Sequence, residues 1–393
     1  MRVVIAGAGL GGLCLAHGLR RSGVDVVVLE RHPTPHARPA SYGIHLNPDG
    51  LSALHACLPD ENWTQLVETS TPAPDIVRFH DQDLRILAER DHTGTPANTD
   101  PVTRRRAVSR DALRDALLLG CGDPIRWGTA FDRFAYTEEG VLVHSADGQA
   151  IEADLLVGAD GANSRVREQR LPDLRRQDLG IVNVAGRVRL TPDLASALPA
   201  TLIDGAVNNV VPARPGWMFL STWDAGAEER YLVWAWAADC SAYPEDAATT
   251  ALLELVRDRT ATWAPPLRRI LAETDPAAVA AIPLKTMPRL PAWEPTAVTM
   301  LGDAIHNMTP MAGIGANTAL RDAATLCRHL TSDGGVPGYE AEMRAYANAA
   351  LALSTRNARG AATTSRLPRH AFRAALRLAE ALPPVKQRMF PVR

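Results

Sequence analysis

Val3-Val4-Ile5-Ala6 is a short apolar run that leads directly into Gly7-Ala8-Gly9-Leu10-Gly11-Gly12, a glycine-rich loop of the G-x-G-x-x-G type. Residues 13–21 follow with helical character, and a second apolar run, 25–29, ends at Glu30. Strand, tight turn, helix and strand in this order form the unit in which such a loop binds a dinucleotide. The sequence therefore predicts a Rossmann-like α/β domain in this part of the chain.

The residues of this loop have separate physical tasks. Gly7 permits the tight turn, Gly9 lets the backbone approach a pyrophosphate, and Gly12 lets the helix pack on the strand. The free N–H groups at the N-terminus of the following helix favour phosphate, and Leu10 and Gly11 of the loop are assigned to cofactor binding with the three glycines. Glu30 follows about 20 residues later, where a carboxylate can accept hydrogen bonds from both ribose hydroxyls. A carboxylate disfavours a 2′-phosphate, so this site suits FAD or NAD, and the loop alone does not choose between them.

Two further motifs lie far along the chain. One is Asp154-Leu155-Leu156-Val157-Gly158-Ala159-Asp160-Gly161-Ala162-Asn163-Ser164-Arg165-Val166-Arg167, and the other is Gly302-Asp303-Ala304-Ile305-His306 followed by Pro310 and by Gly313-Ile314-Gly315-Ala316-Asn317. In this order and at this separation, the three segments resemble the signature of the flavoprotein aromatic hydroxylases, the para-hydroxybenzoate hydroxylase family of class A FAD-dependent monooxygenases. The resemblance spans residues 1–335.

The resemblance implies that FAD is bound and assigns several residues to it. Asp160 is expected near the flavin and pyrophosphate on a turn that Arg167 helps to hold, and Asp303 is expected to bind a ribityl hydroxyl. The segment from Pro310 through Gly313 to Asn317 is expected to wrap the isoalloxazine. A helix that begins near Ala316, after Gly315, would aim its N-terminus at the pyrimidine edge, where reduced flavin carries negative charge.

Smaller assignments also follow from the resemblance. Arg110 matches a position from which a long polar side chain reaches the FAD phosphates, and Gly43 belongs to a segment, 42–46, that passes the flavin edge. Arg31 either lies against the adenine or is a solvated surface residue. His306 is expected to be structural, bonding backbone. For Arg104-Arg105-Arg106, a solvated charge run is favoured over a phosphate clamp.

The predicted domains are not consecutive blocks. We expect an FAD-binding domain from residues 1–74, 100–176 and 285–335, and a mainly antiparallel substrate-binding sheet from 75–99 and 177–284. Helices are expected over 336–393, and 283–295 reads as a proline-punctuated connection. The fold class is therefore α/β: a three-layer Rossmann-like domain with an inserted β-sheet domain and a helical C-terminal tail.

The inserted sheet carries the candidates for the substrate pocket. Aromatic residues alternate along its strands, so one set faces a cavity and the other is core, and core is the commoner place for any single aromatic. The tyrosine pair and arginine that bind para-hydroxybenzoate in the best-known member have no evident counterpart. An apolar pocket predicts a larger, less polar substrate; its candidates are Trp217, Phe219, Trp234 and Trp236, with Pro310 and Met311 from the third motif.

Composition and charge limit the possible partners. The 42 basic and 44 acidic residues give a net charge of −2, which offers no electrostatic reason to expect nucleic acid or an anionic membrane. The five cysteines are scattered and unpaired in spacing, which is typical of a reduced, cytoplasmic chain without a metal site. No apolar run approaches the ~18 residues that span a bilayer, and we expect no signal peptide because a strand is expected to begin within two residues of the start.

Together these features predict a single-component FAD-dependent monooxygenase, a monomer or homodimer. With NADPH or NADH as transient co-substrate and O2 as oxidant, it would hydroxylate or epoxidise an aromatic or polyketide-like small molecule in secondary metabolism, such as antibiotic biosynthesis. No catalytic side chain is assigned, because the flavin carries the chemistry. Two alternatives stay open: a flavoprotein that uses FAD as a scaffold for non-redox cyclisation, and a binding module. A flavin halogenase is disfavoured because Trp234-Ala235-Trp236 is not followed by Ile-Pro.

Overall fold

The computed structural model describes residues 1–35, 37, 43–121, 124–224, 230–243 and 249–391, which form two compact units. The first unit contains Met1–Ser70, Arg110–Gln177 and Lys285–Thr355. The second contains Thr71–Ser109, Asp178–Leu284 and Arg356–Arg393. The C-terminal helical region expected over 336–393 is therefore divided within one helix, α13 (Gly335–Ala362).

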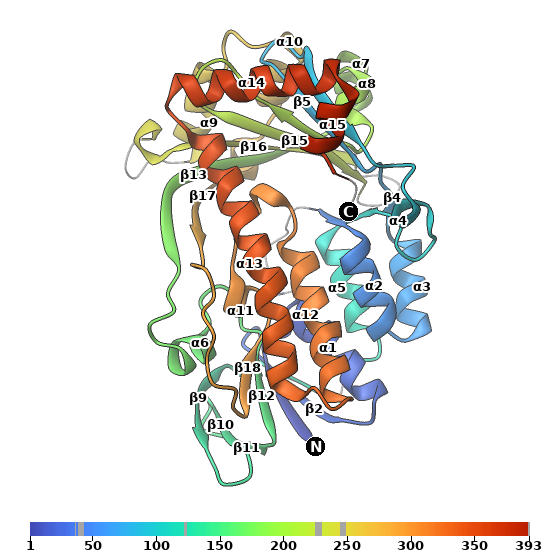
Figure 1. Cartoon of the computed structure of the whole chain (residues 1–393), viewed down its shortest axis with the longest axis vertical. Helices are drawn as coiled ribbons and strands as arrows, with labels where there is room; N and C mark the ends of the chain where they lie inside the picture. The colour runs from blue at the N-terminus through green and yellow to red at the C-terminus, as the bar shows by residue number, and fades with distance from the viewer. Residues whose placement is uncertain (36, 38–42, 122–123, 225–229, 244–248, 392–393) are drawn as a thin grey trace. The chain divides into compact units, whose positions relative to one another are not determined.

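A five-stranded parallel sheet forms the centre of the first unit (Figure 1). Its strand order is β18 (Val298–Met300), β12 (Leu155–Gly158), β1 (Arg2–Ala6), β2 (Asp25–Glu30) and β8 (Ile125–Trp127). The central strand β1 is fully buried from Val3 to Ala6, as expected for a parallel strand covered on both faces. The first and third sequence motifs therefore follow β1 and β18, and the second contains β12 and the turn after it.

Helices cover this sheet, and α1 (Leu10–Arg21) is buried along most of its length. It packs against α2 (Pro48–Cys57) and α12 (Gly315–Leu330). Asn47 caps α2 by accepting from Gly50 N, and Pro48 occupies its first turn, where a missing N–H costs nothing. The shorter helices of this unit are α3 (Asp60–Glu68), α5 (Arg110–Leu118), α6 (Arg165–Arg170) and α11 (Asp303–His306).

The rest of the first unit consists of an antiparallel sheet and short connecting elements. The sheet contains β9 (Phe131–Tyr136), β10 (Val141–Ser145) and β11 (Ala150–Ala153). The strand β3 (Ile44–Leu46) precedes α2, and a 3-10 helix, η3 (Pro310–Ala312), precedes α12.

A seven-stranded sheet forms the centre of the second unit. Its order is β17 (Val279–Thr286), β13 (Gln177–Arg189), β16 (Arg230–Asp239), β15 (Trp217–Asp224), β14 (Val207–Val210), β5 (Ile76–His80) and β6 (Ile86–Asp91). The pairs β13–β16, β16–β15, β15–β14 and β5–β6 are antiparallel, and β14–β5 is parallel. The unit also holds the short antiparallel pair β4 (Thr71–Pro72) and β7 (Arg106–Val108), and α4 (Pro96–Thr99).

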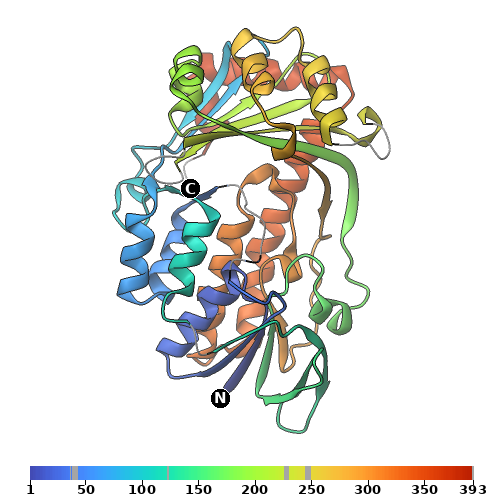
Figure 2. The ribbon, with the colours of Figure 1, turned by 180° about the vertical axis from the view of Figure 1, so that it is seen from behind.

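Different helices pack on this second sheet. One face packs against α7 (Pro192–Ala197), α8 (Ala200–Ile203), α9 (Thr249–Arg259) and α10 (Pro265–Ala272), the lime and gold helices of Figure 2. At the β6 edge, α14 (Arg366–Ala381) packs on the sheet and is followed by α15 (Pro383–Met389). The predicted fold class is confirmed: a Rossmann-like domain, a mainly antiparallel sheet and a helical C-terminal region.

One predicted connection is wrong at its start. Residues 283–295 read as a connection because of their prolines, but β17 continues through Pro283 to Thr286. β17 is an edge strand, and an edge strand tolerates proline because one side of it lacks a hydrogen-bonded neighbour. Within the described ranges, we find no helix long and apolar enough to cross a membrane.

Candidate functional site

The three glycine-containing motifs meet at the ends of adjacent strands in the first unit. A Cβ atom at Gly7 would lie 2.4 Å from the carbonyl oxygen of Ala159, so the first motif touches the second. A Cβ at Gly11 would lie 2.7 Å from Leu301 Cδ1, which brings the first motif against the third. Segments separated by more than a hundred residues therefore form one continuous surface.

The glycine loop is tightly packed everywhere except at Gly9. Gly7 has φ +113°, and a Cβ at Gly12 would lie 2.1 Å from the Gly7 carbonyl oxygen. At Gly9 the nearest atom to such a Cβ would be Ala159 O, 3.9 Å away. Gly9 also precedes α1, which has no side-chain cap and no acidic residue in its first turn. The loop thus leaves room and unsatisfied N–H groups at the position where a phosphate would bind.

Glu30 lies beside this loop. Its side chain is 1% exposed; Oε2 accepts a hydrogen bond from Ala8 N at 2.9 Å, and Oε1 accepts from His32 N at 3.0 Å. The carboxylate is therefore oriented by the backbone of the loop and of its own strand end. Arg31, the next residue, is exposed.

A buried arginine that is not among the predicted residues holds the loop from outside. Arg114 on α5 donates from Nη1 to the Ala8 carbonyl at 2.6 Å and from Nε to the Pro35 carbonyl at 3.0 Å. Its guanidinium lies 5.9 Å from the centre of the Trp127 ring. Arg110, the predicted residue, begins the same helix one turn earlier and is exposed.

Asp160 has one bonded and one unbonded carboxylate oxygen. Oδ2 accepts from Arg165 N at 2.8 Å and from Val166 N at 3.3 Å. Oδ1 is buried, with no hydrogen-bond partner among the described residues. Burial raises the pKa of Asp160, and the free oxygen fits a hydroxyl donor from a ligand.

Arg167 ties the second motif to the third. It is 7% exposed and donates from Nη2 to the Ala162 carbonyl at 3.1 Å and from Nη1 to the Ala304 carbonyl at 2.7 Å. These two bonds connect the turn after Asp160 with helix α11. Desolvation lowers the pKa of Arg167, but an arginine stays charged through the physiological range.

The third motif is organised by Asp322, a fully buried residue of α12. Its Oδ2 accepts from Gly302 N at 2.7 Å and pairs with His306 Nε2 at 2.6 Å, and Oδ1 accepts from the Tyr346 hydroxyl at 2.6 Å. Burial lowers the pKa of His306, but the adjacent Asp322 carboxylate raises that pKa by more than burial lowers it. The pKa of His306 is therefore above its ordinary value. Asp303 stands outside this buried group: it is the exposed first residue of α11.

The segment from Pro310 to Ala316 is open on the side of its glycines. Gly313 has φ +65° and no atom within 4 Å of an added Cβ, and at Gly315 that Cβ would lie 3.7 Å from Met308 Cγ. Helix α12 begins at Gly315 without a side-chain cap or an acidic residue in its first turn. Pro310 is exposed, and Met311 and Ala316 are half-buried.

Asn317 uses its amide on the chain itself. Oδ1 accepts from Asn47 N at 2.9 Å, and Nδ2 donates to the His45 carbonyl at 2.9 Å. The side chain therefore fixes β3 and the start of α2 against α12. Gly43, directly before β3, is half-buried. Tyr42, which belongs to the same predicted flavin-edge segment, lies outside the described residues.

These features fit FAD. Two uncapped helix N-termini, those of α1 and α12, offer N–H groups to anionic or electron-rich groups. Two glycines, Gly9 and Gly315, occupy places where the protein itself has room for a Cβ. The unbonded Asp160 Oδ1 provides a buried acceptor. Within the described ranges, no cluster of three or more His, Cys, Asp or Glu residues could hold a metal ion.

The four aromatic candidates for the substrate pocket divide between the two faces of the second sheet. Trp234 and Trp236 are 0% and 2% exposed in the apolar core under α9 and α10, and Trp234 Nε1 donates to Thr274 Oγ1 at 2.9 Å. Trp217 and Phe219 are half-buried. In the register of β15 and β16 they lie opposite Ala237 and Ala235, which alternate with Trp234 and Trp236, so they are on the other face of the sheet. The alternation along β15 and β16 thus puts Trp217 and Phe219 outside the core under α9 and α10. Trp217 instead packs against a second apolar cluster that includes Leu376, and its ring centre lies 6.0 Å from that of Phe372.

Further residues share the face of Phe219. Trp223 lies 6.3 Å from Phe219 and stacks on Tyr231, also at 6.3 Å between ring centres, and Arg187 lies 5.9 Å from the centre of the Tyr231 ring. Asn183 is 5% exposed, and its Oδ1 has no partner among the residues that the structure describes. This face combines aromatic side chains, of which Trp223 and Tyr231 are largely buried, with a buried hydrogen-bond acceptor.

The arginine run 104–106 is not a solvated surface as expected. Arg104 is exposed, but Arg106 is 9% exposed, and Arg105 is largely buried and pairs with Asp75 at 2.8 Å. The Asp75 carboxylate also pairs with Arg90, at 2.5 Å. Arg105 therefore has a structural role, whereas Arg104 is a surface residue.

Comparison with known proteins shows which protein families and solved structures this chain matches. A family model of the FAD binding domain matches residues 64–359, and one of the NAD(P)-binding Rossmann-like domain matches residues 5–69. A solved structure from Photorhabdus luminescens, assigned as an FAD-containing monooxygenase, is 40% identical, with a TM-score of 0.82 over 92% of this chain and 98% of that one.

Two curated relatives are 28% identical. One is the dual O-methyltransferase/FAD-dependent monooxygenase CTB3 of Cercospora beticola, matched over 87% of this chain but 44% of its own length. The chain thus spans less than half of that dual-function protein. The other is the aurachin C monooxygenase/isomerase of Stigmatella aurantiaca, matched over 88% of this chain and 84% of its own.

Proposed function

Because this chain belongs to the FAD-binding-domain family of class A flavoprotein monooxygenases, we propose that it uses NADPH or NADH and O2 to hydroxylate or epoxidise an aromatic or polyketide-like small molecule. The observation that carries this proposal is the meeting of the three motifs in the first unit, with Gly7 against Ala159 and Gly11 against Leu301. That meeting leaves open N–H groups at two helix ends and one unbonded buried carboxylate oxygen.

The residues around this surface would hold FAD in three parts. Gly9, Leu10 and the first turn of α1 would bind the pyrophosphate, with Glu30 on the adenosine ribose. Arg31 would lie near the adenine and Arg110 near the phosphates. Asp160 and Asp303 would accept hydrogen bonds from hydroxyl groups of the flavin side.

The remaining residues would hold the isoalloxazine. Gly313 and Gly315 would let the backbone lie against the ring, and the N-terminus of α12, with Ala316 in its first turn, would face the pyrimidine. Asn317 would act through the backbone of 45–47, which its amide positions. Pro310 and Met311 would border the substrate, and Gly43 the flavin edge.

When bound, FAD would supply the redox chemistry, with two electrons from the nicotinamide and one O2 giving one oxygen atom to the substrate and the other to water. The contribution of this chain is electrostatic and geometric. The uncapped N-terminus of α12 would stabilise negative charge on the pyrimidine edge without reorganising. Asp322 would keep the loop after β18 in place through its bond to Gly302 N.

The substrate class is inferred from the second sheet. Its face with Phe219, Trp223 and Tyr231 is rich in aromatic rings, which supports a ring system rather than a small polar acid as substrate. Asn183 Oδ1 would accept a hydrogen bond from a hydroxyl or N–H of that substrate. The Stigmatella relative, by its name, acts on aurachin C, and an aromatic or polyketide-like compound is proposed here on that likeness.

A screen of stimulated NADH and NADPH oxidation tests the proposal. Purified protein reconstituted with FAD would be mixed with aromatic and polyketide-like compounds under 18O2, and the products analysed by mass spectrometry. One 18O atom in a product, with oxidation that depends on that compound, is the expected result. FAD bound with no nicotinamide oxidation under any compound would instead point to a scaffold or binding role.

A further inference from the structure

Helix α14 of the second unit presents an apolar stripe to solvent. Leu367, Ala371, Ala374, Leu378 and Leu382 are spaced by four, three, four and four residues, so they fall on one side of the helix and its C-cap. The three leucines are 82%, 51% and 45% exposed, respectively. Single exposed leucines need no explanation, but three on one helical face form a patch.

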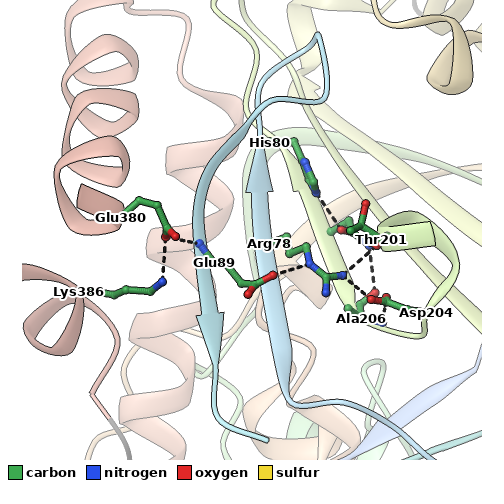
Figure 3. A network of polar contacts seen from close by, with 9 residues as sticks. Arg78, His80, Glu89, Thr201, Asp204, Ala206, Glu380 and Lys386 are labelled. Atoms are coloured by element: carbon green, nitrogen blue, oxygen red, sulfur yellow. Dashed lines mark hydrogen bonds and ion pairs between the residues drawn. The ribbon is translucent and has the colours of Figure 1, made fainter. Parts of the chain in front are cut away.

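The opposite face of α14 is fixed to the sheet, so the stripe cannot turn inward. Arg369 Nη1 donates to the Gly216 carbonyl at 2.9 Å, Arg373 donates to the Val211 carbonyl, and Leu376 is fully buried. Near the end of the helix, Glu380 accepts from Glu89 N on β6 at 2.9 Å (Figure 3). The orientation of the apolar stripe is therefore set by buried hydrogen bonds.

Basic side chains follow one edge of the stripe. Arg366, His370 and Arg377 are exposed and lie on the same side of it, since they are separated by four and seven residues. Residues 356–393 contain nine of the 42 Lys and Arg residues but one of the 44 Asp and Glu residues. That one carboxylate, Glu380, is already paired with Lys386 at 2.9 Å. The net charge of −2 for the chain conceals this local excess.

We propose that the outer face of α14 is a peripheral attachment surface for membranes containing anionic phospholipid. In such binding, a helix lies in the plane of the headgroups, with its apolar side chains inserted and its cations on the lipid phosphates. Here Leu367 and Leu378 would insert, and Arg366 and Arg377 would bind phosphate. The attachment needs no FAD, so it is separable from the proposed oxygenation.

Charge argues against the two other occupants of such a stripe. In a two-fold antiparallel pair of α14 helices from two copies, the edge with Arg366, His370 and Arg377 would face the same edge of its partner, and neither edge carries a carboxylate. A nucleic acid would satisfy the arginines but would leave Leu367 and Leu378 in water. An anionic membrane satisfies both the charges and the leucines.

Flotation of the full chain with vesicles tests the proposal. The vesicles would contain phosphatidylcholine alone or phosphatidylcholine with 30% phosphatidylglycerol, at low and at physiological salt. Binding is expected to the phosphatidylglycerol vesicles and to fall with salt. The double variant Arg366→Gln/Arg377→Gln should reduce the partition coefficient about fivefold per charge, and Leu367→Ser/Leu378→Ser about tenfold or more.

Matched variants elsewhere provide the controls. Arg175→Gln/Arg268→Gln removes the same charge at exposed positions on other segments, and Tyr136→Ser/Ile282→Ser removes exposed apolar groups from other elements. Both should bind like the wild type. Four results would overturn the proposal: no binding to either vesicle, equal loss in the controls, a dimer that the leucine variant dissociates, or duplex DNA binding that outcompetes vesicles and ignores the leucine variant.

Discussion

At the scale of single residues, the glycines of the cofactor surface fall into two groups. Gly7, Gly11 and Gly12 are needed by the fold, because a Cβ at each would meet protein atoms at 2.1–2.7 Å. Gly9 and Gly315 are not needed for that reason, since their nearest neighbours would be 3.9 and 3.7 Å away. A ligand gives a physical reason for glycine in the second group.

A matched pair of substitutions separates the two groups. Gly11→Ala should lower the free energy of unfolding of the apoprotein by about 1–3 kcal/mol, because the methyl group overlaps Leu301 and Ala319. Gly315→Ala should leave that free energy unchanged or raise it by up to about 1 kcal/mol, yet weaken FAD binding. Urea unfolding and FAD fluorescence titration measure the two effects, and a Gly315→Ala protein with wild-type FAD affinity would contradict the assignment of this helix.

The same substitution should change the redox behaviour. Reduced, anionic flavin gains more than oxidised flavin from the N–H groups of α12. Displacing the ring from them should therefore lower the reduction potential by on the order of 30 mV, equivalent to about 1.4 kcal/mol for two electrons. Spectroelectrochemical titration of both proteins gives the answer: an unchanged potential with FAD still bound would mean that α12 does not face the pyrimidine.

Glu30 provides an independent residue-scale test. Glu30→Ala removes the acceptor of the Ala8 and His32 N–H groups and the proposed ribose ligand, and each charge-assisted hydrogen bond contributes about 1.5–3 kcal/mol. The variant should lose FAD during dialysis. Asp25→Ala, at the exposed beginning of the same strand, is the control that should retain it. Full FAD occupancy in both proteins would count against the ribose assignment.

At the scale of elements, Asp322 couples α12, the loop before α11, and α13 through Gly302, His306 and Tyr346. The pKa of His306 in the folded protein is raised above its ordinary value of 6.5. A raised histidine pKa means that the folded state binds the proton more tightly than the unfolded state. Its stabilising contribution is therefore complete below pH 6.5 and is lost as pH rises through the folded pKa.

The pH dependence of His306→Gln checks this sign. The difference in free energy of unfolding between wild type and variant should be largest near pH 6 and should shrink toward pH 9, as measured by urea titration at each pH. His55→Gln, a substitution on the exposed side of α2, serves as the surface control. A difference that grows with pH would show that the Asp322 pairing does not depend on a protonated imidazole.

Element patterns that are local were readable from the sequence. The strand–loop–helix–strand unit at 2–30 and the strands of the sheet domain expected from 75–99 and 177–284 follow from apolar runs and turn residues, and the predicted family, FAD and fold class are confirmed. Arg114, Asp322 and the amide of Asn317 were missed because their partners lie 106, 20 and about 270 residues away. A long-range partner leaves no periodic signal.

At the scale of the whole chain, the aromatic face of the second unit would bind the substrate, and the cofactor surface of the first unit would bind FAD. If the substrate face is apolar and unselective, as its aromatic residues Phe219 and Trp223 suggest for ring systems, poor substrates should trigger reduction without being held for oxygen transfer. NAD(P)H consumption should then exceed product, with the difference recovered as H2O2. A strict one-to-one ratio for every compound that stimulates oxidation would argue for a closed, selective pocket instead.

Hydrogen exchange can test whether one ligand joins all three motifs. FAD that binds only the folded state stabilises it by about 2.7 kcal/mol at a hundredfold excess over Kd. Amides whose exchange requires FAD release should then slow about 100-fold. We expect this protection in peptides covering 7–13, 158–167 and 302–318 together, while α9 and α10 of the second unit serve as internal controls and keep their rates. The packing between the motifs exists without a ligand, so it cannot itself produce a change in exchange that depends on FAD. Protection of 7–13 alone would therefore mean that a nucleotide binds the glycine loop while the other two motifs only support the fold.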